Sequence, residues 1–317
     1  MFTDLSPTQV HLAAERISAH VVHTPLLRSE PLSRAAGGEV FLKLENQQVT
    51  GSFKLRGALN ALATLPDDAR RRGVVASSAG NHGLGVAYAA RALGISARIF
   101  VPRTAPDVKK SGIRRLGATL DDSPPDYDAA MTAAKAYGNA HGLTFINPCL
   151  GDMLLAGQGT VALEILRDLP ALRTLVVCVG GGGLLGGCAS LVRAEAPAVR
   201  IVGAQSDQTA AMARSLAAGR VVQIPVAATL ADGLAGQIDD EALDIGRHAL
   251  DEMVLLTEDE IGRTINWLHR EHRLKVEGAG AVATGAVLLG KTAVEFPAAV
   301  IVSGGNIDDA RWSALVA

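Results

Sequence analysis

The chain has 317 residues, 48% of them hydrophobic but only 3% aromatic, and its net charge at pH 7 is -2. This length suffices for two modest domains or one large α/β unit, whose core must be built from aliphatic side chains. The balance of 30 basic and 32 acidic residues, without a long run of like charge, argues against nucleic acid or an anionic membrane as partner.

The first residues and the cysteines bear on where the protein works. Residues 1–20 carry charges of both signs in an amphipathic pattern, which is unlike a signal peptide. No apolar stretch reaches the roughly 20 residues that a membrane span needs. The three cysteines, Cys149, Cys178 and Cys188, lack metal-ligand spacing and favour a reducing compartment. We therefore expect a cytoplasmic protein that is not held in a membrane.

Short aliphatic runs alternate with helical patterns along nearly the whole chain. Strands are predicted at Val40–Leu44, Gly73–Ser77, Ala97–Val101, Leu175–Val179, Arg200–Gly203 and Ala298–Val302. Helical stretches between them include Gly83–Leu93, Ala129–His141 and Gly157–Leu166. This alternation is typical of α/β proteins with doubly wound parallel sheets.

The segment 44–57, LENQQVTGSFKLRG, follows a predicted strand and opens a helix at about Ser52. Small polar residues at a helix start, with free backbone N–H groups, suit an anion. Lys54 at this place can meet a bound phosphate or attack a carbonyl carbon. Taken alone, however, the same lysine also fits an ordinary exposed position on a helix.

The segment 77–83, SSAGNHG, comes directly after the next predicted strand. Open α/β sheets bind ligands at the carboxyl ends of their strands, and the small polar residues here suit that role. An ordinary turn in which Asn81 caps the following helix is the alternative. The pair Asn81 and His82 favours a binding loop, because the turn requires neither side chain.

Four consecutive glycines, Gly180–Gly183, follow the aliphatic run Leu175–Val179. They allow the backbone to wrap closely around a phosphate at a helix N-terminus. Starting at Gly181, they also fit the dinucleotide pattern G-x-G-x-x-G, which would indicate a nicotinamide oxidoreductase. The next strand runs into Gln205 where a ribose-binding acid is expected, although Asp207 is near, and this weighs against the dinucleotide reading.

The last predicted strand ends in Ser303-Gly304-Gly305-Asn306. By itself this is a tight turn near the end of the sequence. Together with the three segments above, it makes a fourth strand-end loop rich in Gly, Ser or Asn. The carboxyl ends of parallel strands share one edge, so the four loops are predicted to meet at one crevice.

Together these segments resemble the pyridoxal-phosphate (PLP) enzymes of the tryptophan-synthase-β fold, also called fold-type II, in their threonine/serine dehydratase and serine racemase branch. The resemblance runs from His23 to Asn306 and includes AGQGT from Ala156, ADG from Ala231 and VEGAG from Val276. It implies two α/β domains with parallel sheets. The larger comprises residues 1–63 and 146–317, and the smaller, inserted one comprises residues 64–145.

The resemblance also implies roles for individual residues. Lys54 would carry PLP as a Schiff base, Phe53 would pack beside its ring, Asn81 would bond its phenolic oxygen and Ser303 would face its pyridine nitrogen. The phosphate would lie on four glycines: Gly180, Gly181, Gly182 and Gly183. The substrate carboxylate would lie on one loop: Ser78, Ala79, Gly80, Asn81 and His82.

The activity implied is that of a PLP-dependent ammonia-lyase, which converts an L-hydroxy amino acid to a 2-oxo acid and ammonia. Threonine and serine are the expected substrates, and Gly236 leaves room for a bulkier 3-hydroxy amino acid. Ala79 stands where serine racemase has a proton-donating serine, so dehydration is expected to exceed racemisation. A β-replacement transferase of the cysteine-synthase kind, a serine racemase and a PLP-binding regulatory protein without turnover are the alternatives.

Two further expectations concern metals and partners. Gln205 and Ala211 stand where metal-binding members of the branch place a Glu and an Asp, a poor set for a hard cation, so no divalent metal site is predicted. The partners expected are a small amino-acid substrate and, by resemblance, a second copy of the chain in a homodimer.

Overall fold

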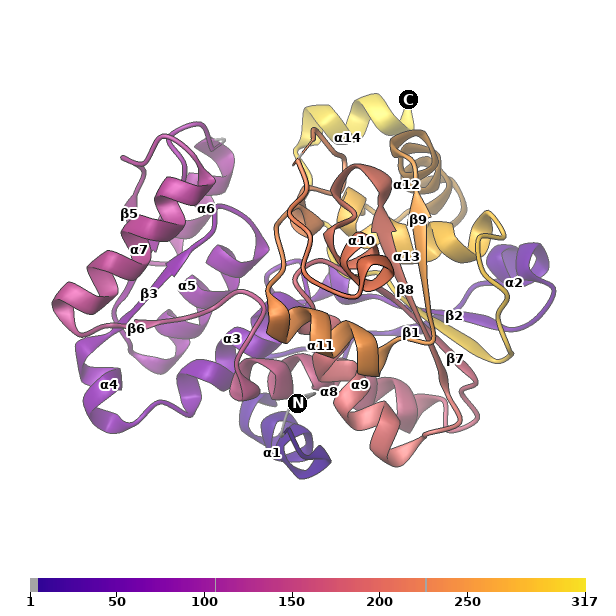
Figure 1. Cartoon of the computed structure of the whole chain (residues 1–317), viewed down its shortest axis with the longest axis horizontal. Helices are drawn as coiled ribbons and strands as arrows, with labels where there is room; N and C mark the ends of the chain where they lie inside the picture. Colours follow the sequence, from indigo (N-terminus) through magenta and orange to yellow (C-terminus); the bar gives the residue numbers. More distant parts are fainter. Residues whose placement is uncertain (1–4, 106, 226) are drawn as a thin grey trace.

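Two β-sheets, each flanked by helices, make up the computed structural model, which describes residues 5–105, 107–225 and 227–317 (Figure 1). The larger sheet has the strand order β1 (Leu26–Arg28), β2 (Val40–Lys43), β10 (Ala298–Ile301), β7 (Thr174–Cys178), β8 (Arg200–Ser206) and β9 (Glu252–Leu256). The smaller sheet has the order β5 (Thr119–Asp121), β4 (Ala97–Phe100), β3 (Val74–Ser77) and β6 (Thr144–Phe145).

Parallel pairing dominates both sheets, as predicted. The strand β1 is the exception, since it runs antiparallel to β2 at the edge of the larger sheet. The central strands β3, β7 and β10 are buried along their whole length, which explains their continuous aliphatic sequences. All six predicted strands are present within one to three residues of their predicted ends, and Met1–Asp4 of the predicted N-terminal pattern lie outside the described residues.

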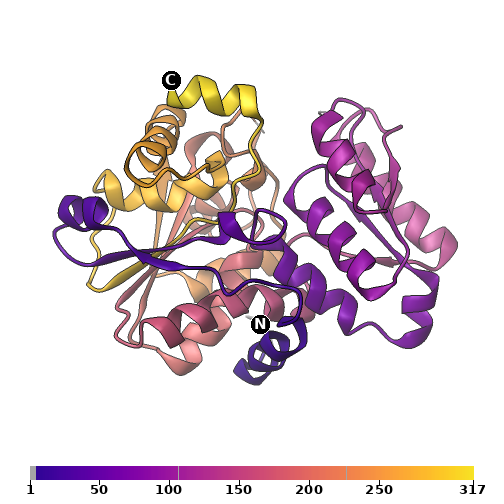
Figure 2. The same ribbon diagram turned by 180° about the vertical axis from the view of Figure 1, so that it is seen from behind.

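The helices connect the strands and cover the sheets (Figures 1 and 2). In chain order they are α1 (Pro7–Ile17), α2 (Glu30–Ala36), α3 (Lys54–Ala63), α4 (Asp67–Arg72), α5 (Asn81–Leu93), α6 (Asp107–Arg115), α7 (Tyr127–His141), α8 (Asp152–Asp168), α9 (Gly183–Glu195), α10 (Ala211–Ala218), α11 (Asp240–Ala249), α12 (Glu258–His272), α13 (Gly278–Leu288) and α14 (Asp309–Val316). Short 3-10 turns are η1 (Glu45–Gln47), η2 (Asp207–Thr209) and η3 (Asp232–Leu234). Within the described part of the chain, no helix combines the length and apolarity that crossing a membrane requires.

The smaller sheet is built from one continuous stretch of the sequence. Its four strands all lie between Val74 and Phe145, inside the predicted insert of residues 64–145. The larger sheet combines β1 and β2 from before that stretch with four strands from after it. The chain therefore crosses between the two sheets twice, and the boundaries at residues 63/64 and 145/146 stay a prediction.

Glycines bring three helices of the larger unit into backbone contact. A Cβ on Gly157 of α8 would lie 2.5 Å from the carbonyl oxygen of Arg56 and 2.6 Å from the Cα of Gly57, both on α3. Two residues later, on the opposite side of α8, a Cβ on Gly159 would lie 2.6 Å from the carbonyl oxygen of Gly187 on α9. The helix α8 is thus in close contact with both α3 and α9, which only residues without a side chain permit.

Beside this contact lies a fully paired cluster of buried charges. The Arg56 guanidinium donates to both carboxylate oxygens of Glu45 at 2.8 Å, and to those of Glu164 at 2.7 and 2.9 Å. Lys43 Nζ donates to Glu164 at 2.6 Å. Burial alone would lower the pKa of Arg56, but the two carboxylates raise it above its usual value. Two positive and two negative charges balance, so the cluster joins β2, η1, α3 and α8 without a net buried charge.

Replacing Arg56 by leucine would leave two carboxylates facing Lys43 alone. Breaking a buried ion pair by removing one partner costs about 3–5 kcal/mol, so we expect Arg56→Leu to lower the free energy of unfolding by that amount in urea denaturation. Arg173→Leu is the matched control, because Arg173 pairs with Glu295 at a half-exposed surface position, where an ion pair contributes about 0–1 kcal/mol. Equal losses in both variants would contradict a structural role for the cluster.

Candidate active site

The four loops singled out in the sequence follow β2, β3, β7 and β10, and backbone hydrogen bonds join the first to the last. The amide of Phe53 donates to the carbonyl of Ser303 at 3.1 Å, and the amide of Gly305 donates to the carbonyl of Gly51 at 2.9 Å. An isolated antiparallel bridge between Ser52 and Gly304 lies between these bonds. The segment that carries Lys54 is therefore held against the C-terminal loop, 250 residues later in the chain.

Lys54 is the first residue of α3, and its amine is held by a backbone carbonyl. Lys54 Nζ donates to the carbonyl oxygen of Pro148 at 2.6 Å and lies 3.9 Å from Cys149 Sγ. It also lies 5.3 Å from the centre of the Phe53 ring. Among the described residues, no carboxylate lies within ion-pair distance of it. This half-buried amine is thus not the exposed helical lysine that the sequence alone allowed, and no salt bridge occupies it.

The glycine loop lies close to the same amine. Gly182 has a φ of +87° and is the N-cap of α9, where no side chain caps the first N–H groups. A Cβ on Gly181 would lie 2.7 Å from Cys149 Sγ, and one on Gly183 would lie 2.8 Å from the carbonyl oxygen of Cys149. Cys149 therefore separates Lys54 from the loop by one side chain. Uncapped N–H donors at a helix N-terminus bind anionic groups such as phosphate.

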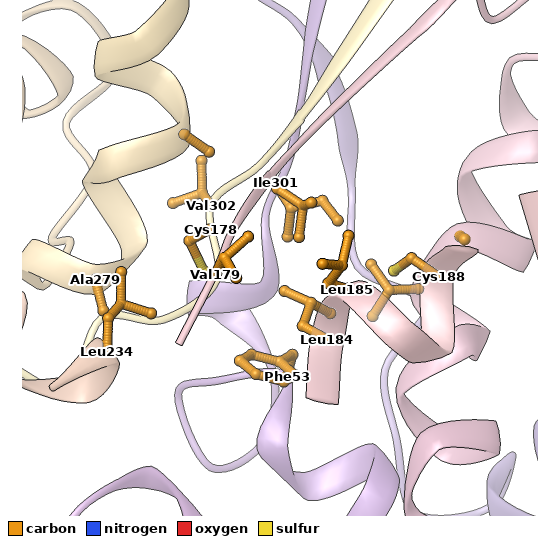
Figure 3. Packing of buried hydrophobic residues seen from close by; sticks show 14 of the residues in the cluster. Phe53, Cys178, Val179, Leu184, Leu185, Cys188, Leu234, Ala279, Ile301 and Val302 are labelled. Atoms are coloured by element: carbon orange, nitrogen blue, oxygen red, sulfur yellow. The ribbon is translucent and has the colours of Figure 1, made fainter. Parts of the chain in front are cut away.

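Apolar side chains pack around the glycine loop. Phe53 is buried, and it belongs to one hydrophobic cluster with Leu184 of α9, Leu234 of η3 and the ends of β7 and β10 (Figure 3). The backbone of Leu234 also approaches Gly180, where a Cβ would lie 3.2 Å from the Cα of Leu234. The site therefore has an apolar floor with polar backbone groups at its rim, a composition that suits an aromatic ring carrying a phosphate.

Asn81 does not cap α5, contrary to the alternative interpretation of its loop. The N-cap is Gly80, and no side chain bonds to the first turn of the helix. Instead Asn81 Nδ2 donates to Glu277 Oε1 at 2.6 Å, and Asn81 Oδ1 accepts from Asn306 Nδ2 at 2.7 Å. The start of α5 beside the smaller sheet is thereby joined to two segments of the larger unit.

His82 is buried and fixes the loop rather than supplying charge. A hydrogen bond of 3.0 Å joins His82 Nε2 to the carbonyl oxygen of Ile146, so this nitrogen carries the proton. Burial, with a smaller effect from the Lys54 charge, lowers the pKa of His82 to about 3. The imidazole is therefore neutral at physiological pH. Any anion held by Ser78, Ala79 and Gly80 must bind their backbone and hydroxyl groups, not a histidinium.

Ser303 is buried at the end of β10. Its hydroxyl donates to the carbonyl of Ala279 at 3.4 Å. Burial raises the pKa of Cys178 to about 11, so the thiol stays protonated. Cys178 ends the neighbouring strand β7, where its buried thiol packs within the hydrophobic core.

The end of β8, where metal-binding relatives were expected to place acids, carries neutral groups. Gln205 is buried, and its Oε1 accepts from the backbone N–H of Ala213 at 3.2 Å. No cluster of three or more His, Cys, Asp or Glu side chains with metal-binding geometry occurs among the residues that the structure describes. The absence of a divalent cation site stays a prediction for a chelator to test.

Sequence reasoning missed the roles of three contributors to the site. Pro148 was given no role toward Lys54 and Cys149 entered only the count of cysteines, but they hold the Lys54 amine and separate it from the glycine loop. Glu277 was quoted within a matching motif and given no role. A single acid before the small-residue run Gly278-Ala279-Gly280 was the available signal, because a helix of such residues is buried on all sides.

Comparison with known proteins decides between the PLP and dinucleotide interpretations. A family model described as "Pyridoxal-phosphate dependent enzyme" matches residues 17–304. The chain belongs to this family. Its cofactor is pyridoxal phosphate, so the dinucleotide interpretation of the glycines is wrong. The residues fit the group: Lys54 for the carbonyl carbon, the uncapped glycine loop for the phosphate and the Phe53 floor for the ring.

Similar proteins share most of the chain. An L-threonine ammonia-lyase of Thermotoga maritima is 42% identical over 297 residues, covering 93% of this chain and 74% of that protein. The catabolic L-threonine dehydratase TdcB of Staphylococcus aureus is 37% identical, covering 96% of this chain and 90% of that protein. The solved structure of maize serine racemase superposes with a TM-score of 0.93 at 31% identity, covering 99% of this chain and 97% of that one.

We expect one added methyl group in the glycine loop to weaken PLP binding strongly. The Cβ of Gly183→Ala would collide with the backbone of Cys149, which cannot rotate away, so we expect PLP affinity to fall by at least about a hundredfold in equilibrium titration. Gly262→Ala is the matched control. Gly262 lies in α12, and a Cβ there would make ordinary contacts at 3.6 Å with the side chains of Leu230 and Leu315. Retained affinity in Gly183→Ala would show that the loop does not hold the phosphate.

Proposed function

We propose that this protein dehydrates and deaminates an L-hydroxy amino acid, threonine or serine in the first instance, to a 2-oxo acid and ammonia. The observation that supports this proposal is the position of the Lys54 amine. The Pro148 carbonyl holds this amine, and Cys149 lies between it and the uncapped glycine loop. The two threonine-specific relatives, at 42% and 37% identity, support this reaction over others in the family.

Lys54 is the group that moves protons. Bound PLP supplies an electron sink for the pair left at the substrate Cα. Lys54 Nζ, as a free amine, takes the Cα proton, and the Pro148 carbonyl fixes where that nitrogen lies. Ser303 would offer its hydroxyl to the ring nitrogen of the bound cofactor. A hydroxyl would not keep that nitrogen protonated as a carboxylate would, which would favour prompt loss of the β-hydroxyl.

The loop of Ser78, Ala79 and Gly80 is proposed to bind the substrate carboxylate. The neutral, buried His82 anchors this loop to the end of β6 through Ile146. Asn81, directly before His82 at the same end of the loop, contacts Glu277 and Asn306, and the N–H of Ser78 at the other end donates to the carbonyl of Phe100 at 3.1 Å. The N–H of Gly80 donates to Ser78 Oγ at 3.1 Å, so the N–H of Ala79 and those of the first turn of α5 are the groups proposed to orient the carboxylate. Orientation of this kind is a large part of catalysis.

Gly236 is the residue proposed to limit the size of the substrate side chain. A Cβ built on Gly236 would meet nothing within 4 Å. This open space supports activity toward a bulkier 3-hydroxy amino acid in addition to threonine and serine. One methyl group in an apolar pocket discriminates by only about 1–3 kcal/mol, so threonine and serine are expected to compete.

We further infer that the enzyme is cytoplasmic and forms a homodimer. Three free cysteines, Cys149, Cys178 and Cys188, support a reducing compartment. Gln48 bonds the backbones of both Val22 and Val49, so these two exposed valines lie close together and offer an apolar patch to a second copy. Sedimentation at micromolar concentration measures the oligomeric state.

The reaction is tested by 2-oxo acid and ammonia release from the purified holoenzyme. The panel contains L-threonine, L-serine, their D-enantiomers, threo-3-hydroxyaspartate and 3-phenylserine, each with and without a chelator. We expect turnover of an L-substrate, insensitivity to the chelator, and loss of activity in Lys54→Ala by at least about a thousandfold. No oxo acid from any substrate, despite bound cofactor, would shift the assignment to a β-replacement transferase or to a binding protein without turnover.

The likeness to maize serine racemase makes racemisation the second candidate activity. Ala79 has no proton to donate on the face opposite Lys54, so we expect the wild type to racemise serine poorly. Ala79→Ser should raise D-serine formation relative to pyruvate by about tenfold or more, measured by chiral chromatography. Ala79→Val is the control without a hydroxyl. Efficient racemisation by the wild type would contradict the role given to this position.

A further inference from the structure

Glu277 is a buried acid for which the mechanism above has no use. Its side chain is 5% exposed, and its amide donates to the carbonyl of Gly304 at 3.2 Å at the start of α13. Unlike the buried Glu45 and Glu164, it has no arginine or lysine within ion-pair distance among the described residues. The polar side chain that it contacts is Asn81, which donates to Glu277 Oε1 at 2.6 Å. A buried carboxylate without a cation is costly and therefore calls for a functional reason.

The orientation of the Asn81 amide follows from the backbone. Asn306 Nδ2 donates to the carbonyl of Thr50 at 2.8 Å, and a carbonyl can only accept, so the nitrogen of Asn306 must face this way. The second hydrogen of Asn306 Nδ2 goes to Asn81 Oδ1 at 2.7 Å. Asn81 must then direct its own nitrogen away from Asn306, and Glu277 accepts one of the two hydrogens of that nitrogen.

This arrangement leaves one polar hydrogen of Asn81 unassigned. A carboxamide has two N–H donors and one acceptor oxygen. The oxygen and one N–H are engaged by Asn306 and Glu277, so a single N–H remains to be offered to a ligand. We propose that Glu277 is a positioning residue, which fixes the Asn81 carboxamide so that this single N–H is directed at the cofactor oxygen. The inference rests on the proposed contact between Asn81 and PLP.

A carboxylate enforces this orientation better than another amide would. An ionised carboxylate only accepts, so Asn81 gains nothing by presenting its oxygen to Glu277. A charged acceptor also makes a shorter and stronger bond, which polarises the Asn81 amide toward donating. The Cβ of any residue replacing Gly304 would collide with Glu277 Oε1, so the C-terminal loop of the site leaves room for this carboxylate.

The charge of Glu277 is poised to change in the neutral pH range. Burial raises its pKa to about 7, against the hydrogen bond from Asn81. Three charged groups face it from other elements: Asp232 of η3 raises the pKa, whereas Lys109 of α6 and Lys54 of α3 lower it. The Lys109 ammonium lies 3.2 Å from Asp232, so these two charges partly offset each other. When Glu277 ionises, its hydrogen bond from Asn81 becomes stronger. The affinity for the cofactor therefore gains a pH-dependent component.

A double-mutant cycle on PLP affinity tests whether Glu277 acts through Asn81. The variants are Glu277→Leu, Asn81→Ala and their combination, with the dissociation constant of PLP measured on each apoprotein by equilibrium titration. We expect each single variant to weaken binding about tenfold or more, and the double variant to bind no more weakly than Asn81→Ala. If the loss of PLP affinity in the double variant equals the product of the losses in the two single variants, the proposal is wrong.

Conservative and matched variants separate positioning from structural damage. Glu277→Gln keeps an acceptor oxygen for Asn81, so we expect its PLP affinity within about threefold of wild type, without the pH-dependent component near pH 7. The absorption band of the bound cofactor should shift in Glu277→Leu and return in Glu277→Gln. Glu252→Leu is the matched control. It removes a carboxylate on β9 that Arg200 and Thr292 contact, and in the part of the chain that the structure describes no hydrogen bond joins that carboxylate to Asn81.

The apoprotein provides a second readout that needs no cofactor. Because the folded-state pKa of Glu277 exceeds its unfolded value of 4.5, the folded chain binds this proton more tightly. The resulting stability is fully present below pH 4.5 and is lost as the pH rises through 7. We expect Glu277→Gln to remove this part of the pH dependence of unfolding, and Glu252→Gln to retain it. An unchanged pH dependence in Glu277→Gln would show that the carboxyl is not buried as an acid.

These measurements are independent of the substrate assay. If no hydroxy amino acid is turned over but the cycle shows coupling between Glu277 and Asn81, the proposed reaction fails and the positioning role stands. If threonine or serine is turned over but Glu277→Leu binds PLP as wild type does, the reaction stands and the positioning role fails.

Discussion

The contact of α8 with α3 on one side and α9 on the other is the constraint on which the site depends. Lys54 begins α3, and the glycine loop begins α9, so the distance between the lysine and the phosphate site is set by how closely these helices approach α8. Gly157 and Gly159 reduce that separation to backbone contact. A backbone contact cannot relax by changing a rotamer, so the two halves of the site are held at a fixed spacing.

The charged side chains around the candidate site form two groups, one that stabilises the fold and one that is available to the cofactor and substrate. Arg56, Glu45, Glu164 and Lys43 neutralise one another in the interior, two residues away from Lys54. Among the described residues, Lys54 Nζ contacts the Pro148 carbonyl, the Cys149 thiol and the Phe53 ring, and it forms no ion pair. The neighbouring cluster supplies rigidity without adding a net charge beside the reactive amine. The ionisable groups of the site can therefore respond to cofactor and substrate instead of to the scaffold.

Much of this architecture could be predicted from the sequence, because buried parallel strands are continuous aliphatic runs and four of them end in small polar loops. The missed strands are short or half-exposed: β1, β5 and β6 have two or three residues, and β9 begins with Glu252. Lys54, the glycines and Ser303 were found by local pattern and resemblance. The roles of Pro148 and Glu277 were not, because a backbone carbonyl has no sequence signature and the contact of Glu277 with Asn81 joins residues 196 positions apart.

The strand order of the larger sheet also bears on how the chain is assembled during synthesis. The smaller sheet uses one continuous stretch and can form as soon as Phe145 has emerged. By contrast, β2 lies between β1 and β10, so its inner edge stays unpaired until Ala298–Ile301 is made, roughly 250 residues later. At about 5–20 residues per second this delay is on the order of tens of seconds. The nascent N-terminal hairpin thus presents an open, aliphatic edge for that time, which makes it a natural place for a chaperone to act.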